Sequence, residues 1–151
     1  MPIYRPLQPA FHLLRANTRR GARRNIAAHY DLGNEFYELW LDDTMAYSCA
    51  MFEPGAGDDL CDAQRSKWNR LLDLLQPGSR DHLLEIGCGW GGFMEHAASR
   101  YDVHVTGLTL SEEMATYARK RLAEAGLTDR TEVKLQDFQH ERGMYDKVVS
   151  I

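Results

Sequence analysis

The chain has 151 residues, of which 44% are hydrophobic, and its formal net charge at pH 7 is −4. These values are ordinary for one soluble globular domain that is long enough to bury a core. They argue against a membrane-spanning or secreted protein, because no apolar run is long enough to cross a bilayer and no secretory signal is present.

The three cysteines, Cys49, Cys61 and Cys88, are scattered and form no C-x-x-C pair. This spacing indicates neither a zinc site nor a disulfide framework. The histidines show no metal-ligand spacing either. Reduced thiols are the simplest explanation for the cysteines, so we expect a cytoplasmic protein without a metal.

Residues 1–30 contain no aspartate or glutamate, whereas the rest of the chain is acidic. Their arginines are Arg5, Arg15, Arg19, Arg20, Arg23 and Arg24. This basic leader could lie on anionic lipid at the inner membrane face, or it could be a solvated helix or a frayed terminus. Nucleic-acid binding would also fit the arginines, but nothing downstream supports it. The pattern over residues 10–28 predicts a helix that Gly21 could interrupt.

Two further helices are expected before the first strand. Asn34 can cap a short helix that ends at Trp40, and Asp58 or Asp59 can cap a longer helix that runs to about Leu75. The longer helix carries apolar residues along one face, and a Pro-Gly pair ends it.

From residue 78 onward, strand and helix patterns alternate. Strands are expected at His82–Ile86, Val103–Leu108, Thr131–Leu135 and Asp146–Ile151, with helices from the glycine cluster through Ser99 and from Ser111 to about Glu124. This alternation predicts an α/β fold with a parallel, doubly wound, Rossmann-like sheet. We therefore expect an N-terminal helical segment over residues 1–77 and the start of a Rossmann-like domain over 78–151. Because such a sheet normally needs more than four strands, the chain reads as the front part of a larger protein or as a truncated product.

The most informative local pattern is LLEIGCGWGGF, from Leu83 to Phe93. A short apolar strand with an acidic residue enters a glycine cluster, and a helix can start directly after it. Glycines allow a tight turn and close approach of a ligand, and the helix N-terminus offers unpaired N–H groups. The pattern predicts a loop for an adenosine-containing cofactor; the alternative is a glycine-rich turn without a ligand.

Gly87, Gly89 and Gly92 satisfy the dinucleotide pattern G-x-G-x-x-G when it is taken literally. Two details favour S-adenosyl-L-methionine instead. Glu85 stands where a carboxylate can orient the loop and the methionine amino group, and Trp90 is bulky where a pyrophosphate would prefer small neighbours. A nicotinamide enzyme would also need a carboxylate at the end of the second strand, and residues 105–108 contain none.

Five segments of this sequence resemble the motifs of a single protein family. They are HYDLGN at 29–34, YSCA at 47–50, LEIGCGWGG at 84–92, GLTLS at 107–111 and YDKVVSI at 145–151. Over about residues 25–151 the chain resembles the cyclopropane-fatty-acyl-phospholipid synthases, which include the mycolic acid cyclopropane synthases. The first two segments at their present spacing are the most specific part of the resemblance.

The resemblance implies methyl transfer from S-adenosyl-L-methionine to the cis double bond of an unsaturated acyl chain in a phospholipid. A carbocation then forms, a bound bicarbonate ion takes a proton, and the cyclopropane ring closes. Such a site must exclude water and place a weak base beside the methyl group. The alternatives are a relative that only methylates the double bond, a relative that acts on a small amine, and a truncated non-catalytic fragment.

The resemblance also implies roles for residues at the methionine end of the cofactor. Tyr47 and Ser48 would hold that end. Gly87 and Gly89 would let the cofactor lie against the backbone, with Glu85 supporting the loop. For Tyr47, a half-buried ring with a satisfied hydroxyl is the alternative.

The remaining implied roles concern the nucleoside and the anion. Thr109 and Leu110 would contact the ribose region, and Asp137 would read the adenine amino group unless it is only a turn residue. The backbone N–H of Cys49 would donate to bicarbonate, which makes Cys49 the catalytic candidate. Met114 departs from the family, whose members often carry a ribose-binding glutamine there; Glu112 or Glu113 could substitute.

Overall fold

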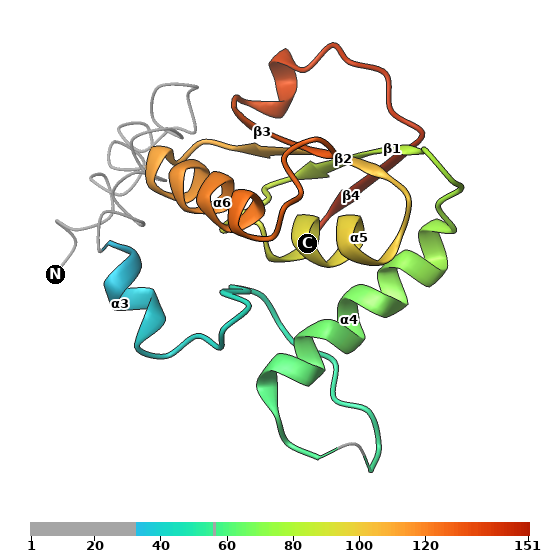
Figure 1. The fold of residues 1–151 in the computed structure, drawn as a ribbon. Coiled ribbons are helices and arrows are strands. Elements are labelled where there is room, and N and C mark those ends of the chain that lie inside the picture. Colours follow the sequence, from blue (N-terminus) through green and yellow to red (C-terminus); the bar gives the residue numbers. More distant parts are fainter. Residues whose placement is uncertain (1–32, 56) are drawn as a thin grey trace, which may run out of the picture. The chain divides into compact units, whose positions relative to one another are not determined.

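The computed structural model describes residues 33–55 and 57–151. Four parallel strands form one sheet with the order β3-β2-β1-β4 (Figure 1). The elements are α3 Asn34–Glu38, α4 Leu60–Leu75, β1 His82–Ile86, α5 Gly92–Arg100, β2 His104–Thr109, α6 Glu112–Glu124, β3 Thr131–Leu135, the 3-10 helix η1 Phe138–His140 and β4 Lys147–Ser150. The expected α/β fold and its four strands are confirmed. The basic leader, the helix expected over residues 10–28 and the start of the HYDLGN segment lie outside the described residues.

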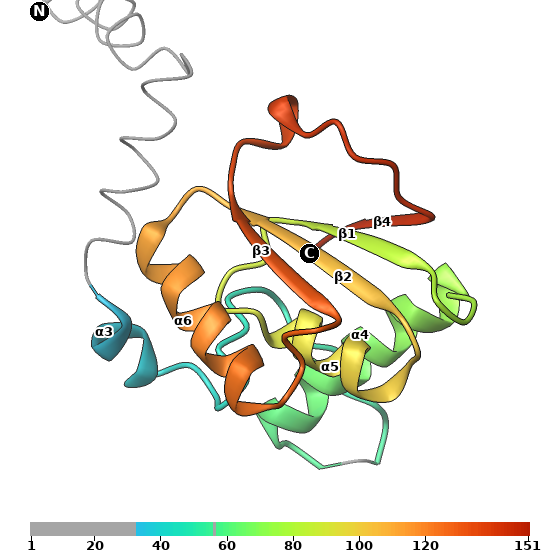
Figure 2. The same cartoon turned by 45° about the horizontal axis from the view of Figure 1, so that its top comes forward.

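The described helices α4, α5 and α6 lie on one face of the sheet (Figures 1 and 2). Each of β1, β2, β3 and β4 contributes apolar side chains to that face, and the cluster they join includes Leu83, Val105, Val133 and Val149. The opposite face carries the long loop with η1 (Figure 2). No helix among the described residues is long and apolar enough to cross a membrane.

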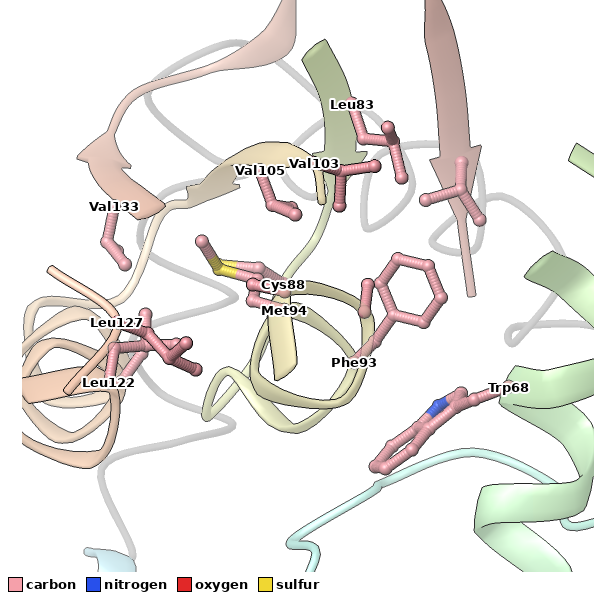
Figure 3. Packing of buried hydrophobic residues seen from close by; sticks show 14 of the residues in the cluster. Trp68, Leu83, Cys88, Phe93, Met94, Val103, Val105, Leu122, Leu127 and Val133 are labelled. Carbon is pink, nitrogen blue, oxygen red and sulfur yellow. The ribbon is translucent and has the colours of Figure 1, made fainter. Parts of the chain in front are cut away.

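The core lies between β1, β2 and helix α5. Figure 3 shows Phe93 reaching toward Leu83 and Trp68, while Met94 lies with Cys88 below Val105. Burial of each large apolar side chain stabilises the fold by about 1.5–3 kcal/mol. This packing fixes α5, and therefore the glycine loop before it, against the centre of the sheet.

Two helix caps agree with the expectation. Asp59 caps α4 by accepting a hydrogen bond from the Asp62 N–H at 2.8 Å. Ser111 caps α6, where its hydroxyl oxygen accepts from the Met114 N–H at 3.2 Å. Each cap satisfies an N–H group that the helix leaves without a partner.

The expected cap of α3 is wrong. Gly33 is the N-cap residue and makes no side-chain cap, Asn34 lies inside the helix, and the helix ends at Glu38 instead of Trp40. The Asn34 side chain accepts a hydrogen bond from the Trp90 indole N–H at 2.7 Å instead. A contact between distant parts of the chain therefore overrides the local capping preference.

Candidate cofactor site

The candidate site lies at the carboxyl end of β1. This strand pairs with β2 on one side and with β4 on the other, so the order of the strands reverses there. Ligands of open α/β sheets bind at such switch points. The Ser150 hydroxyl donates to the Ile86 carbonyl at 3.0 Å and ties the ends of β4 and β1 together directly before the glycine loop.

The loop after β1 is held by β2. The N–H groups of Gly87 and Cys88 both donate to the Leu108 carbonyl, at 2.9 Å each. Gly87 and Gly89 have φ values of +81° and +51°, a region that other residues rarely adopt. A Cβ atom added to either would meet nothing within 4 Å. Their outer side is therefore open, as the approach of a cofactor requires.

Gly92 is constrained in a different way. A Cβ atom there would lie 2.7 Å from the Thr44 carbonyl oxygen and 2.8 Å from the Trp68 ring. The third glycine of the literal dinucleotide pattern therefore serves packing between α5 and the chain before α4. Only the first two glycines leave room for a ligand.

Glu85 lies in β1, two residues before the loop, and only 3% of it is exposed. Its neighbours in the sheet are Gly107 and Val149, neither of which can pair with a carboxylate side chain. Among the described residues, no group donates to its Oε2 atom. Burial raises the pKa of Glu85 to about 8, although the positive charge of Lys67 acts in the opposite direction. A buried carboxylate oxygen without a donor is unfavourable, so it indicates a cationic or hydrogen-bonding ligand.

Residues 46–49 are attached to one face of α4. The Gln64 amide group donates to the Ser48 carbonyl at 2.9 Å and to the Ala46 carbonyl at 3.4 Å. The Lys67 ammonium group donates to the Ser48 hydroxyl oxygen at 2.7 Å and to the Cys49 carbonyl at 3.0 Å. Cys49 is exposed, whereas Cys88 is buried, as expected for a small apolar residue.

Tyr47 belongs to an aromatic cluster that reaches the glycine loop. Its ring centroid lies 5.6 Å from that of Tyr37 and 5.2 Å from that of Trp40, and Tyr37 lies 5.0 Å from Trp90. Tyr47 is 56% exposed and packs on both rings, so its position also fits the alternative of a half-buried ring. Trp90 is buried and faces α3, where it joins the glycine loop to Asn34.

Thr109 is the last residue of β2, Leu110 follows it, and Asp137 follows β3 at the same edge of the sheet. The Thr109 hydroxyl oxygen accepts from the Ser111 N–H at 3.2 Å, and the Thr109 carbonyl accepts from the Gln136 N–H at 3.0 Å. Asp137 caps η1 through one carboxylate oxygen, which accepts from the Gln139 N–H at 2.9 Å. Asp137 therefore acts as a turn residue in this structure, and a contact with adenine would be an additional role.

Met114 is buried in α6, while Glu112 and Glu113 are exposed in the first turn of that helix. A methionine side chain offers only a weak acceptor, so it cannot replace a ribose-binding amide. Either glutamate remains the candidate for that contact.

Sequence reasoning misses several polar residues that shape the site. Gln64 and Lys67 are one helical turn apart on α4, and only their i, i+3 spacing beside an apolar face could have drawn attention to them. Arg121 donates to the carbonyl of Thr44 at 2.7 Å and to that of Trp90 at 3.3 Å. It therefore joins α6 to both the glycine loop and the chain before α4.

Glu141 is a further residue that the sequence does not reveal. Its carboxylate accepts from the N–H groups of Arg142 and Gly143 and from the side chains of Lys134 and Gln136. The N–H groups of Gly143 and Arg142 and the Lys134 ammonium group, first of all the Gly143 N–H, lower the pKa of Glu141 to about 2. It closes the loop that begins with Gln136 and Asp137.

In the part of the chain that the structure describes, no group of three or more potential metal ligands occurs. His96 is buried in α5 and bonds to the Asn69 side chain at 2.7 Å, and burial lowers its pKa to about 4. His82 lies 2.8 Å from the Thr106 hydroxyl. Both histidines are therefore engaged in the fold.

The family described as mycolic acid cyclopropane synthetase matches residues 17–151. A tuberculostearic acid methyltransferase of Mycobacterium tuberculosis is 45% identical over 156 residues, which cover 99% of this chain and 35% of that protein. Cyclopropane mycolic acid synthase 2 of Mycobacterium bovis is 43% identical over 128 residues, covering 83% of this chain and 41% of that protein.

A solved structure shows the same fold. A mycolic acid cyclopropane synthase complexed with SAH and CTAB superposes with a TM-score of 0.80 at 37% identity, over 85% of this chain and 45% of that chain. The chain therefore spans less than half the length of the relatives that it matches.

Proposed function

The chain belongs to the mycolic acid cyclopropane synthetase family, and from that premise we propose that it forms the S-adenosylmethionine site of an enzyme that modifies unsaturated acyl lipids. The reaction is transfer of the sulfonium methyl group to a cis double bond, followed by closure of a cyclopropane ring. The observation that carries the proposal is the buried Glu85 oxygen without a donor, next to a glycine loop whose outer side is open.

The residues present fit the zwitterionic methionine end of that cofactor. Glu85 offers a carboxylate to its ammonium group, and the Ser48 and Tyr47 hydroxyls lie on a segment linked to the loop through aromatic contacts. Gly87 and Gly89 leave the backbone open for the ligand. Thr109, Leu110 and Asp137 stand at the ends of the next two strands, where the ribose and adenine would lie. Bound S-adenosylmethionine supplies an electrophilic methyl group.

We assign bicarbonate binding to the backbone N–H of Cys49 as part of the same proposal. The Cys49 side chain is exposed, and its carbonyl is fixed by Lys67. The peptide that carries the Cys49 N–H also has a defined orientation, because Gln64 donates to its carbonyl, that of Ser48, at 2.9 Å. The ion would take the proton whose loss allows ring closure, and the thiol would take no part.

A second candidate is methylation of the double bond without ring closure. The similarity to a tuberculostearic acid methyltransferase supports this second candidate function. The two reactions share the cofactor site and differ in how the cation is quenched. Mass analysis of lipid products separates them, because a cyclopropane and a methyl branch give different masses after saturation of the remaining double bonds.

We also propose that residues 1–77 are a helical segment that contributes to both substrate and cofactor contacts, and that residues 78–151 begin the cofactor domain. The six arginines of residues 1–30 would bring the protein to an anionic membrane surface on its cytoplasmic side, where the acyl lipid is found.

The test is calorimetric titration of the chain with S-adenosylhomocysteine, with NAD as the control ligand. Binding of S-adenosylhomocysteine alone supports the proposal. If neither ligand binds a chain that is well folded by circular dichroism, the cofactor assignment is wrong.

A further inference from the structure

Lys67 lies in the middle of α4 and is partly buried beside the candidate site. Its ammonium group makes three hydrogen bonds, to the Ser48 hydroxyl oxygen at 2.7 Å, the Cys49 carbonyl at 3.0 Å and the Gln64 amide oxygen at 2.5 Å. An ammonium group has three N–H donors and no acceptor. All three donors of Lys67 are therefore used, and none is left to contact a ligand directly.

The direction of the bond to Ser48 has a chemical consequence. Because Lys67 can only donate, the Ser48 oxygen must accept, and the hydroxyl hydrogen of Ser48 must point to another acceptor. Lys67 thereby turns Ser48 into a donor with a fixed direction. The Ser48 carbonyl is held separately by Gln64, so the backbone of this residue cannot turn to change that direction.

The charges near Lys67 show the same polarity. Burial lowers the pKa of Lys67, and the nearby acidic groups of Cys49, Asp42 and Glu85 oppose that effect. Lys67 and Glu85 lie close enough to influence each other's pKa, so an ammonium group and a carboxyl group, the latter protonated below about pH 8 in the free protein, occur together at the candidate site. A ligand end that carries both a carboxylate and an ammonium group matches this arrangement.

Resting on the proposed function, we infer that Lys67 is a positioning residue that orients the Ser48 hydroxyl as a donor toward the carboxylate of the cofactor's amino-acid end. It acts through Ser48 and does not touch the cofactor. Its effect should therefore be confined to ligands that carry the carboxylate.

The experiment compares two ligands with one variant. S-adenosylhomocysteine carries the amino-acid end, whereas 5′-methylthioadenosine has the same nucleoside and thioether without it. Lys67→Met keeps the length of the side chain and removes its three donors. We expect its affinity for S-adenosylhomocysteine to fall by about tenfold or more, with less than about a twofold change for 5′-methylthioadenosine. Lys120→Met is the matched control, because Lys120 is an exposed lysine on α6 whose one ion-pair partner among the described residues is Glu124.

A second arm tests whether Lys67 acts through Ser48. In a Ser48→Ala background, Lys67→Met should change the affinity for S-adenosylhomocysteine by less than about threefold, since the two residues form one unit. Full additivity of the two substitutions would overturn the inference. Equal weakening of both ligands would also overturn it, because that result indicates a general structural role.

A second variant keeps the inference testable if Lys67→Met does not fold. If Lys67→Met gives no cooperative thermal transition, Lys67→Arg takes its place, because arginine keeps the charge but cannot direct three N–H groups from one atom. The same preferential loss of S-adenosylhomocysteine binding supports the inference, and unchanged binding contradicts it.

Failure of the unaltered, folded chain to bind S-adenosylhomocysteine would overturn the proposed function, and the inference with it. Tight binding by both the chain and its variants would overturn the inference alone.

Discussion

The indole N–H of Trp90 donates to the Asn34 side chain at 2.7 Å, across 56 positions of the sequence. One partner lies in the glycine loop and the other in the first described helix. Because Tyr37 of the same helix packs on Trp90 and on Tyr47, this bond connects α3 to both halves of the candidate site. The bond and its aromatic surroundings therefore hold the end of the HYDLGN segment against the glycine loop, and Tyr37 extends these contacts to the YSCA segment.

Replacing Asn34 by alanine should destabilise the protein by about 1–3 kcal/mol, since it removes the acceptor of a hydrogen bond made by a buried side chain. Urea denaturation followed by tryptophan fluorescence measures the change. Asn34→Asp is the control, because it retains the acceptor oxygen. Equal stability of the alanine variant and the unaltered chain would mean that water replaces the bond.

Replacing Gly89 by valine should abolish S-adenosylhomocysteine binding while the fold is retained. Valine would place a branched side chain on the open side of the loop, at a φ of +51° that is unfavourable for it by about 1–2 kcal/mol. Gly55→Val is the matched control: Gly55 also has a positive φ with open space around it, but it lies in the loop before α4. Calorimetry and circular dichroism together separate loss of binding from loss of fold. Unchanged affinity would contradict the assignment of the loop.

Glu85 should make the free protein less stable as the pH rises. In the folded protein its pKa is raised from 4.5 to about 8. Between these values the folded state holds a proton that the unfolded state has lost, so the free energy of unfolding falls by up to about 1.4 kcal/mol per pH unit. Urea denaturation between about pH 5 and pH 8 measures this slope.

Glu85→Gln is the control for that slope, because glutamine has no proton to lose and leaves Lys67 and Cys88 in place. Its stability should change less over the same range. Parallel profiles for the two proteins would show that Glu85 does not titrate there. Addition of S-adenosylhomocysteine should reverse the trend in the unaltered chain, since the ligand's ammonium group favours the ionised carboxylate.

Removing residues 1–24 should weaken binding to anionic vesicles, because this segment holds all six arginines of the basic leader. The difference should shrink at high salt, where surface charges are screened. Co-sedimentation with vesicles at low and high salt measures both effects. Persistent binding by the shortened chain would show that lipid contact lies elsewhere.

The strands and the two longest helices could be predicted because their signals are local. His82–Ile86 follows from a short apolar run, and in Thr131–Leu135 charged residues alternate with apolar ones. Asp59 and Ser111 are capping residues placed before periodic segments. The glycine loop is equally local. Its position at the switch point follows from parallel strand order.

The contacts of Asn34 and Lys67 could not be predicted in the same way. Asparagine is a common helix cap, but the side chain of Asn34 accepts a hydrogen bond from Trp90, which is distant in the sequence. Lys67 looks like an ordinary solvated lysine of an amphipathic helix until its three acceptors are known. In both cases the decisive partner comes from another element, and periodicity carries no information about it.

The glycines of the loop also differ in what they would tolerate under mutational scanning. Gly87 and Gly89 are limited by backbone angle, so asparagine or aspartate, which enter that region most readily, should be the least damaging replacements for folding. Gly92 is limited by the Thr44 carbonyl and the Trp68 ring, so even alanine should be rejected. A mutational scan of this loop, in which the cellular abundance of each variant is measured, should therefore show partial tolerance at Gly87 and Gly89 and none at Gly92. The G-x-G-x-x-G sequence pattern treats these three glycines as equivalent.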